Sequence, residues 1–168
     1  KKWKPILDIE KRPIIGINWQ GNPKHEKSNS KGRSIALEKL AKIASSISGS
    51  LLSFQKGYGS EQLAKCSFRD KFVNSQNQIN CSIDFSESAA ILEYCDLVIT
   101  TDTSLAHLSG ALGRPTWVLL KYVPEWRWGL DKENTFWYPS MRLFRQKKQG
   151  DWEDVINSIS HEILSLNL

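Results

Sequence analysis

Four short apolar runs occur along the chain, each bounded by polar residues, glycine or proline. Runs of this length that are rich in β-branched side chains are typical of strands buried on both faces of a sheet. They predict strands over residues 14–18, 51–54, 96–100 and 116–120, and weaker patterns predict strands over 79–83 and 142–144.

The stretches between these runs predict helices. After Ser34, a potential N-cap residue, apolar side chains recur every three or four positions until Gly49. Further helices are expected over residues 60–66, 86–94, 104–112 and 151–164. Strands that alternate with helices favour parallel strands joined by right-handed crossovers. We therefore predict an α/β fold, a doubly wound Rossmann-like parallel sheet of about six strands.

The length of 168 residues is sufficient for one domain with its own core. We expect residues 1–13 to form a linker or lead-in helix and residues 14–168 to form the domain. The chain begins without a methionine, so we expect it to be a fragment of a longer protein. No apolar run approaches the roughly 20 residues of a membrane span, and the start of the chain lacks the apolar stretch of a signal peptide. We therefore expect no membrane span and a cytoplasmic location.

Charge and cysteine content narrow the possible functions only slightly. The 23 basic and 18 acidic residues give a net charge of +5, which suits a phosphate-bearing ligand. Basic residues are spread along the sequence, so nucleic acid is a weaker alternative. The three cysteines include no C-x-x-C pair and no zinc-ligand spacing, which favours reduced structural thiols and no metal site.

The predicted sheet indicates where a ligand would bind. In doubly wound sheets, ligands bind beyond the carboxyl ends of the strands, where the strand order reverses. If the order is the common 3-2-1-4-5-6, the first and fourth strands are neighbours. The loop after Asn18 then lies beside the loop after Thr100, and these two loops carry the most unusual polar residues of the chain.

The segment after Thr100 is the first candidate for an anion site. A helix that starts near Ser104 presents unpaired backbone N–H groups and a partial positive charge, and Asp102, Thr103 and Ser104 surround this start. His107 is expected on the same helical face as Ser104. The alternative is an ordinary helix cap, with His107 packed against the sheet.

Two more loops carry candidate ligand-binding residues. After the first strand, Gln20, Gly21 and Asn22 begin a long polar stretch that ends at Arg33. After the second strand come Lys56 and Glu61, and an acidic residue in this position often accepts hydrogen bonds from ribose hydroxyls. The alternatives are a solvated basic loop for the first segment and, for Glu61, a favourable place in the first turn of a helix.

The segment from Tyr122 to Tyr138 is rich in aromatic residues, including Trp126, Trp128 and Trp137. Such side chains combine a large apolar area with a polar group. Three interpretations remain open: a lid, an interface with another domain, or packing under a long loop.

Several of these segments resemble one enzyme family. Residues 102–115, DTSLAHLSGALGRP, resemble the signature D-T-x-x-x-H-L-x-x-A-L-G-x-P of glycosyltransferase family 9, the heptosyltransferase-like enzymes. The wider set INWQGNP, RSI, SFQKG, PEWRW and WYPSMRLFRQ is more similar to the glycosyltransferase-like domain at the C-terminal end of bacterial tetratricopeptide-repeat proteins. The resemblance covers nearly the whole chain from Ile14 onward.

This resemblance implies the C-terminal half of a B-type glycosyltransferase, the half that binds a nucleoside-diphosphate sugar. It places Asp102, Thr103 and Ser104 at the diphosphate and sugar. It also implies inverting sugar transfer without a metal or other cofactor. The catalytic base would belong to an N-terminal acceptor-binding domain that this sequence lacks, so the isolated chain is expected to bind the donor without turnover.

By the same resemblance, Arg33 matches a position that contacts phosphate, Glu61 matches one that binds ribose, and His107 matches the signature histidine near the donor. One departure is Ser104, because heptosyltransferases usually have glycine there, so the identity of the sugar stays open. The nucleotide base and the acceptor stay open as well. The main alternative is a non-catalytic scaffold or interaction domain attached to tetratricopeptide repeats.

Overall fold

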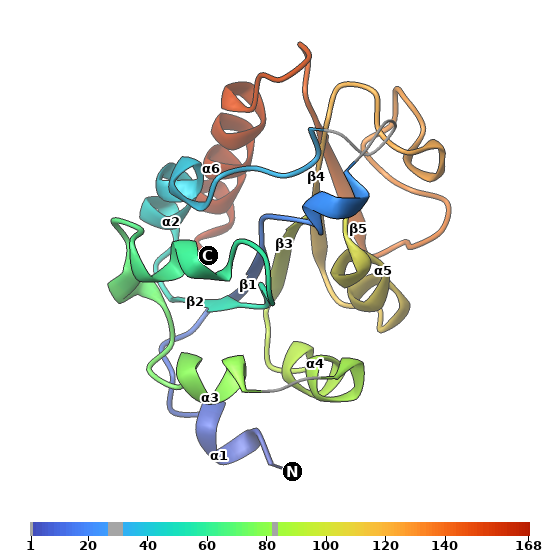
Figure 1. Ribbon diagram of the computed structural model, residues 1–168. Coiled ribbons are helices and arrows are strands. Elements are labelled where there is room, and N and C mark those ends of the chain that lie inside the picture. The colour runs from blue at the N-terminus through green and yellow to red at the C-terminus, as the bar shows by residue number, and fades with distance from the viewer. Residues whose placement is uncertain (1, 27–31, 82–83) are drawn as a thin grey trace.

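The computed structural model describes residues 2–26, 32–81 and 84–168. Its centre is a five-stranded, fully parallel sheet with the order β2-β1-β3-β4-β5 (Figure 1). The strands are β1 (Ile14–Asn18), β2 (Ser50–Ser53), β3 (Leu97–Thr101), β4 (Thr116–Leu120) and β5 (Met141–Arg145). The α/β fold and the doubly wound parallel sheet predicted from the sequence are thus confirmed, with five strands in place of six.

The two faces of the sheet are covered by different helices. The α-helices are α1 (Lys4–Leu7), α2 (Ala41–Ser46), α3 (Gln76–Asn80), α4 (Phe85–Leu92), α5 (Ser104–Ala111) and α6 (Glu153–Leu166). Short 3-10 helices are η1 (Pro23–His25), η3 (Leu37–Leu40), η4 (Ser60–Ala64), η5 (Arg69–Lys71) and η6 (Trp126–Trp128). In Figure 1, α2 and α6 lie together on one side of the sheet, with α4 and α5 on the other.

Alternation along the strands divides the core between these faces. On β1, Ile15 and Ile17 join a buried cluster with residues of α2 and α6, whereas Ile14 joins a second cluster with α1, α3 and α4. A third cluster packs Ala106 of α5 against the other end of the sheet, around Val118. Every residue of β1, β2, β3 and β4 is buried, as expected for strands covered on both faces.

The strand expected over residues 79–83 is wrong. Residues 79 and 80 belong to α3, and residues 82 and 83 lie outside the described part of the chain. The side chain of Ile79 is fully buried although it belongs to a short helix. A pattern this short is compatible with a helix as well as with a strand. On the side of β2 away from β1, the described residues form one isolated parallel bridge, between Leu51 and Phe72.

The start of the second helical region also differs from expectation. The region begins at Leu37 as η3 and continues as α2, so Ser34 is not its N-cap. The Ser34 hydroxyl instead accepts a hydrogen bond from the Gly21 N–H at 3.0 Å and donates one to Glu26. A side chain that the local pattern assigns to a helix therefore belongs to the loop after β1.

Candidate functional site

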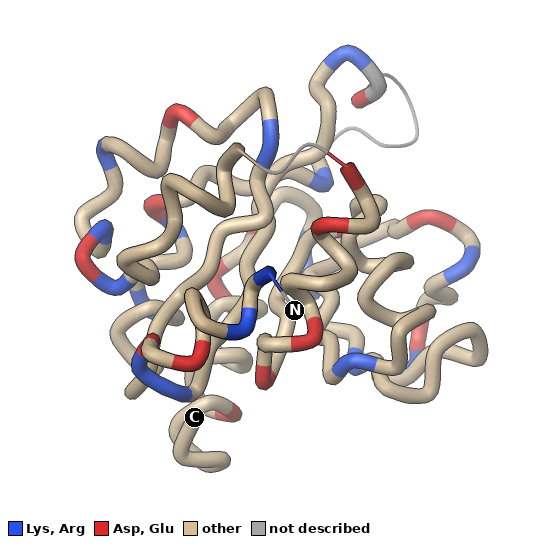
Figure 2. The backbone as a smooth tube through the Cα atoms, turned by 90° about the horizontal axis from the view of Figure 1, so that it is seen from below, with Lys and Arg blue, Asp and Glu red and all other residues tan. Residues whose placement is uncertain are grey.

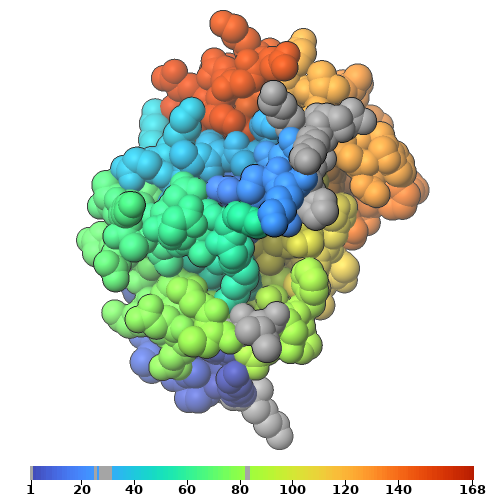
Figure 3. Space-filling model, viewed as in Figure 1, coloured from blue at the N-terminus to red at the C-terminus, as the bar shows by residue number. Residues whose placement is uncertain are grey.

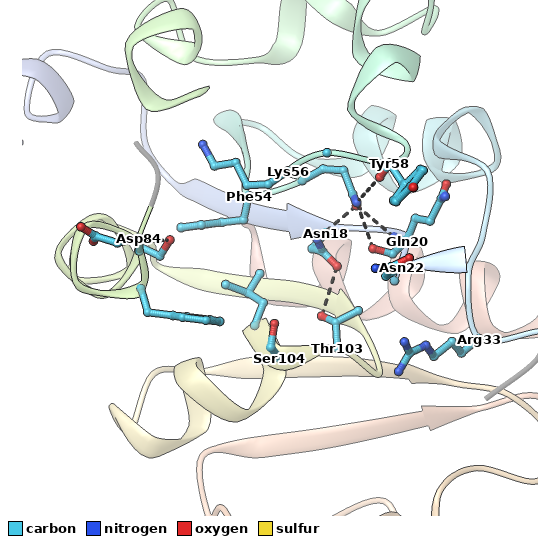
Figure 4. A pocket seen from close by; sticks show the side chains of 16 residues that line it. Asn18, Gln20, Asn22, Arg33, Phe54, Lys56, Tyr58, Asp84, Thr103 and Ser104 are labelled. Atoms are coloured by element: carbon cyan, nitrogen blue, oxygen red, sulfur yellow. Dashed lines mark hydrogen bonds between the residues drawn. The ribbon is translucent and has the colours of Figure 1, made fainter. Parts of the chain in front are cut away.

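A cavity of about 630 Å³ opens at the carboxyl ends of β1, β2 and β3. Figure 4 shows its walls, and the blue, green and yellow segments that contribute them meet on the face seen in Figure 3. The lining residues are Asn18, Gln20, Gly21, Asn22, Arg33, Phe54, Gln55, Lys56, Gly57, Tyr58, Asp84, Phe85, Ser88, Thr103, Ser104 and Leu105.

The cavity lies at the point where the strand order reverses. From β1 the chain crosses to β2 on one side, and from β2 it passes over to β3 on the other side of β1. The register pairs Asn18 with Thr100, which confirms that the two polar loops are neighbours. Thr103 Oγ1 donates a hydrogen bond to Asn18 Oδ1 at 3.2 Å and so joins the loops directly.

The floor of the cavity is organised by the side chain of Gln55, which is only 4% exposed. Its Oε1 accepts hydrogen bonds from Asn18 Nδ2 and from the backbone N–H groups of Trp19 and Gln20, at 3.0–3.2 Å. Its Nε2 donates to the carbonyl oxygens of Gln20 and Tyr58, at 2.9 and 2.7 Å. One amide group therefore holds the loop after β1 against the loop after β2.

Helix α5 points its N-terminus into the cavity. Thr103 is the N-cap residue, but its side chain makes no cap hydrogen bond, because it is turned toward Asn18 and Thr100. Ser104 and Leu105 of the first turn line the cavity. The first backbone N–H groups of a helix carry a partial positive charge, so this end of α5 is suited to bind an anion.

Arg33 forms the wall beside this helix end. Its Nη1 donates to the carbonyl oxygen of Asp102 at 3.0 Å, and its Nε lies 3.5 Å from Glu26 Oε1. A Cβ atom on Gly21 would lie 2.6 Å from Nη2 of Arg33, so the guanidinium occupies the space that a side chain at position 21 would need. The sequence-predicted residues Gln20, Gly21, Asn22, Arg33, Lys56, Thr103 and Ser104 all line the cavity.

The opposite end of the cavity is aromatic. Figure 4 places Phe54 and Asp84 at this end and Arg33 at the other, with Thr103 and Ser104 between them. Phe85 also lines the cavity and is 63% exposed, whereas Tyr58, which is 46% exposed, lies beside Gln20 in Figure 4. Gly16 in the middle of β1 makes room for this arrangement, because a Cβ there would lie 2.7 Å from the Phe54 ring.

Two ionisable groups at this end are held by local hydrogen bonds. The Glu87 N–H and the Ser86 hydroxyl donate to Asp84, which caps α4, and these bonds hold the pKa of Asp84 below its usual value. Burial lowers the pKa of Lys56, and its Nζ donates to the carbonyl oxygen of Ile79 at 2.5 Å. The downward shift of the Asp84 pKa favours its ionised form, whereas the downward shift of the Lys56 pKa disfavours its charged form.

Three predicted site residues do not line the cavity. Glu61 lies on η4, and Asp102 contributes its carbonyl oxygen to Arg33 instead of its carboxylate to the cavity. His107 stacks on Trp128 with ring centroids 5.2 Å apart, and its Nδ1 lies 3.1 Å from the Tyr138 hydroxyl. In this structure His107 therefore packs against the aromatic segment, whereas its suggested role at the donor remains a prediction.

The aromatic segment itself is divided between core and surface. Trp128 is 2% exposed and belongs to the core cluster beneath the segment. Trp126, Phe136 and Trp137 are 71%, 96% and 51% exposed. The Trp137 ring lies edge to face with the rings of Trp126 and Phe136, with centroids 6.1 and 6.3 Å apart. Packing under the loop thus accounts for Trp128. The exposed rings of Trp126 and Trp137 are compatible with an interface.

Sequence reasoning missed several residues that the fold brings to the cavity. Asn18, Gln55 and Asp84 are polar, and each follows or ends a recognisable pattern: Asn18 ends a buried strand, Gln55 follows one, and Asp84 precedes Glu87 at capping distance. These signals were available. Phe54 and Phe85 carried none, because an aromatic residue beside an apolar run is expected in the core.

The charge distribution, the helices and the grouping of possible metal ligands add three observations. Lysine and arginine positions are interspersed with acidic ones along the chain instead of forming one stripe (Figure 2). None of the helices in the described ranges is long and apolar enough to cross a bilayer. Within the same ranges, no three His, Cys, Asp or Glu side chains are grouped as metal ligands would be.

Comparison with known proteins gives the following matches. Residues 59–149 match the sequence profile of glycosyltransferase family 9 (heptosyltransferase). Protein FlbA of Caulobacter vibrioides is 32% identical over 82 residues, which are 49% of this chain and 13% of FlbA. The chain thus spans only a small part of that protein.

Three solved structures share the fold. They are the E. coli ADP-heptose lps heptosyltransferase II, a family 9 glycosyl transferase from Veillonella parvula, and the E. coli heptosyltransferase WaaC with ADP-2-deoxy-2-fluoro heptose. Each is 15% identical, with TM-scores of 0.55, 0.55 and 0.53 over 94%, 91% and 95% of this chain. The chain covers 48%, 46% and 44% of their lengths, so it spans about half of each.

Proposed function

The chain belongs to glycosyltransferase family 9, and we propose that it is the half of such an enzyme that binds the nucleoside-diphosphate sugar. The observation that carries this proposal is the uncapped N-terminus of α5, which opens with Arg33 into the cavity at the strand switch point. A helix end and a guanidinium together provide donors and positive charge for a diphosphate.

The cavity suits the remaining parts of such a ligand as well. The aromatic end, with Phe54 and Phe85, provides flat apolar surfaces against which a nucleotide base can stack. A base at that end and a diphosphate at Ser104 would direct the sugar toward the Arg33 end. One solved relative is described with an ADP-linked heptose analogue, which supports a nucleoside-diphosphate sugar as the ligand class.

In the proposed reaction, this half stabilises the departing nucleoside diphosphate. Negative charge develops on the diphosphate as the bond to the sugar breaks, and the α5 N–H groups and Arg33 are placed to neutralise it. We propose that an N-terminal domain supplies the acceptor and the base for inverting transfer, and that tetratricopeptide repeats belong to the parent protein. The isolated chain would then bind and position the donor without turnover.

A second function has one specific observation in its favour. The exposed cluster of Trp126, Phe136 and Trp137 is the kind of surface that contacts other proteins or domains. A scaffold that has lost transferase chemistry would use this surface and would leave the cavity without a ligand. Nucleotide binding therefore separates the two functions.

Ser104→Pro provides a sharp test of the diphosphate site. Proline is tolerated at the first position of a helix, and the extended backbone of Thr103 (φ −136°, ψ 174°) suits a residue that precedes proline. The change removes one backbone N–H from the proposed site. Because a charge-assisted hydrogen bond contributes about 1.5–3 kcal/mol, we expect ADP, GDP or UDP to bind roughly 10- to 100-fold more weakly in calorimetry.

Ser104→Ala is the matched control, since it removes the hydroxyl but keeps the N–H, and its affinity should stay within a few-fold of the wild type. Arg33→Ala should weaken nucleoside diphosphates about as much as Ser104→Pro, while the corresponding nucleosides keep their affinity. Wild-type protein that binds no nucleoside diphosphate at millimolar concentration would contradict the proposal, as would equal affinities for the proline and alanine variants.

A further inference from the structure

A chain of hydrogen bonds runs from the glycine turn after β1 to the arginine at the cavity wall. The Gly21 N–H donates to Ser34 Oγ, the Ser34 hydroxyl donates to Glu26 Oε1, and the same oxygen faces Arg33 Nε at 3.5 Å. The Arg33 guanidinium is anchored a second time by the Asp102 carbonyl oxygen. We propose that Glu26 is a positioning residue, which holds Arg33 in the orientation that binds the diphosphate.

This inference rests on the proposed function, and burial is its first support. The side chains of Glu26 and Arg33 are 13% and 20% exposed. Ionised groups are seldom withdrawn from water to this extent unless they are paired and hydrogen-bonded. The Glu26 carboxylate is therefore part of a built cluster, in contrast to a solvated charge on a polar loop.

The geometry of the guanidinium is the second support. Arg33 uses Nε toward Glu26 and Nη1 toward Asp102, two of the three corners of a planar group. Nη2 lies against Gly21, and the hydrogen bonds of the guanidinium to described residues use Nε and Nη1 instead. Fixing two corners of a plane fixes the third, so the carboxylate and the carbonyl together determine where the free N–H groups point.

The two possible roles of Glu26 predict opposite changes in diphosphate affinity when its charge is removed. A carboxylate that is merely near a diphosphate repels it, so replacement by a neutral residue would strengthen binding. A carboxylate that orients the phosphate-binding arginine supports binding, so the same replacement would weaken it. The sign of the change in affinity therefore decides between a bystander and a positioning residue.

The experiment measures nucleoside-diphosphate affinity by calorimetry for Glu26→Gln, Arg33→Ala and the double variant. Glutamine keeps the size of the side chain and an acceptor for Ser34. We expect Glu26→Gln to weaken the diphosphate by about three- to tenfold, as contacting residues typically couple, and to leave the corresponding nucleoside unchanged. In the Arg33→Ala background, Glu26→Gln should give no further loss.

Glu93→Gln is the charge-matched control, because Glu93 is exposed and does not line the cavity. Unchanged or tighter binding of the diphosphate by Glu26→Gln would overturn the inference. An equal loss in the Arg33→Ala background would also overturn it, since Glu26 would then act without Arg33. Melting temperatures of all variants show whether a loss of affinity reflects a loss of fold.

A measurement without ligand keeps this inference separable from the proposed function. The Arg33 Nε–H signal in ¹H–¹⁵N spectra of the free protein should exchange slowly in the wild type and rapidly in Glu26→Gln. Equal exchange in both proteins would show that Glu26 does not hold Arg33, whatever the nucleotide data show. Slow exchange that Glu26→Gln abolishes, together with no nucleotide binding by the wild type, would overturn the proposed function and with it the diphosphate part of the inference.

Discussion

Gly16 shows how one residue of the sheet shapes the ligand cavity. It interrupts the β-branched residues of β1, although glycine weakens strands. A Cβ on residue 16 would lie too close to the Phe54 ring. The missing side chain therefore leaves room for this ring, which follows β2 and lines the cavity. A glycine that weakens the strand thus leaves space for the aromatic end of the cavity, where we propose that the base binds.

The three cysteines should differ in reactivity according to their burial. Cys95 is buried, and burial raises the pKa of its thiol to about 12, whereas Cys81 is exposed. A raised pKa disfavours the thiolate, which is the reactive form, so Cys95 is almost entirely protonated at pH 8. We expect iodoacetamide to modify Cys81 in the native protein and Cys95 only after unfolding, as read by peptide mass spectrometry.

Burial also raises the pKa of Cys66, so this thiol should be labelled more slowly than Cys81. Addition of guanidinium chloride is the control, since it should make all three thiols equally reactive. Labelling of Cys95 at the rate of Cys81 in native protein would show that the second core cluster opens to solvent.

At the scale of elements, the connection between α2 and β2 lies in close contact with the residue that precedes β1. Gly49 joins α2 to β2, and a Cβ there would lie 1.9 Å from the Pro13 carbonyl oxygen and 2.4 Å from the Pro13 nitrogen. The same carbonyl accepts a hydrogen bond from the Ser50 N–H at 2.9 Å, which sets the start of β2 beside β1. The glycine is thus required by the close approach of two backbone segments.

Gly49→Ala should therefore destabilise the fold strongly. Backbone atoms cannot move aside as flexible side chains do, so the cost should reach at least the upper part of the about 1–3 kcal/mol typical of overpacking. Urea unfolding followed by circular dichroism measures the change. Ser48→Ala, at the exposed neighbouring position, should stay within about 0.5 kcal/mol of the wild type. A similarly small effect of Gly49→Ala would refute the close approach.

The elements also show how far the sequence predicted the fold. Strands β1, β2, β3 and β4 were evident because buried parallel strands are continuous apolar runs. The pairing of β1 with β3 followed from the common doubly wound order, and it located the cavity correctly. Ser34 and the segment around Ile79 were misjudged, because capping residues and short apolar runs are decided by tertiary contacts that no local pattern contains.

The candidate site was predictable in part for a similar reason. Thr103 and Ser104 belong to a helix start, and Arg33 belongs to a basic loop, so local chemistry identified them. Phe54 and Phe85 come together only after the chain has folded around Gly16 and the N-terminus of α4. The contacts of His107 with Trp128 and Tyr138 join residues more than 20 positions apart, so no local pattern contains them, and its role at the donor stays a prediction.

The whole molecule has two covered faces that share the same strands. Ile15 and Ile17 of β1 belong to one core cluster and Ile14 to the other, and β3 divides its residues in the same way. Neither face can lose its packing without disturbing strands that support the opposite face. The lead-in helix α1 is part of this arrangement, since Trp3 and Leu7 are buried in the second cluster.

We therefore expect the chain to unfold as a single cooperative unit. Tryptophan emission, which reports on buried residues such as Trp19, Trp117 and Trp128, should change at the same urea concentration as the far-ultraviolet circular dichroism. Trp126→Phe is the control, because this exposed ring contributes emission but little stability. Two separated transitions would mean that the faces of the sheet unfold independently.

The amide of Gln55 has a consequence for the entropy of ligand binding. Four of its hydrogen bonds order Asn18, Trp19 and Gln20, and a fifth reaches the carbonyl oxygen of Tyr58. Loops that become ordered only on binding lose conformational freedom at that moment, and the loss subtracts from affinity. In this protein the loss at the cavity floor occurs during folding, so a ligand that enters finds little backbone motion left to suppress.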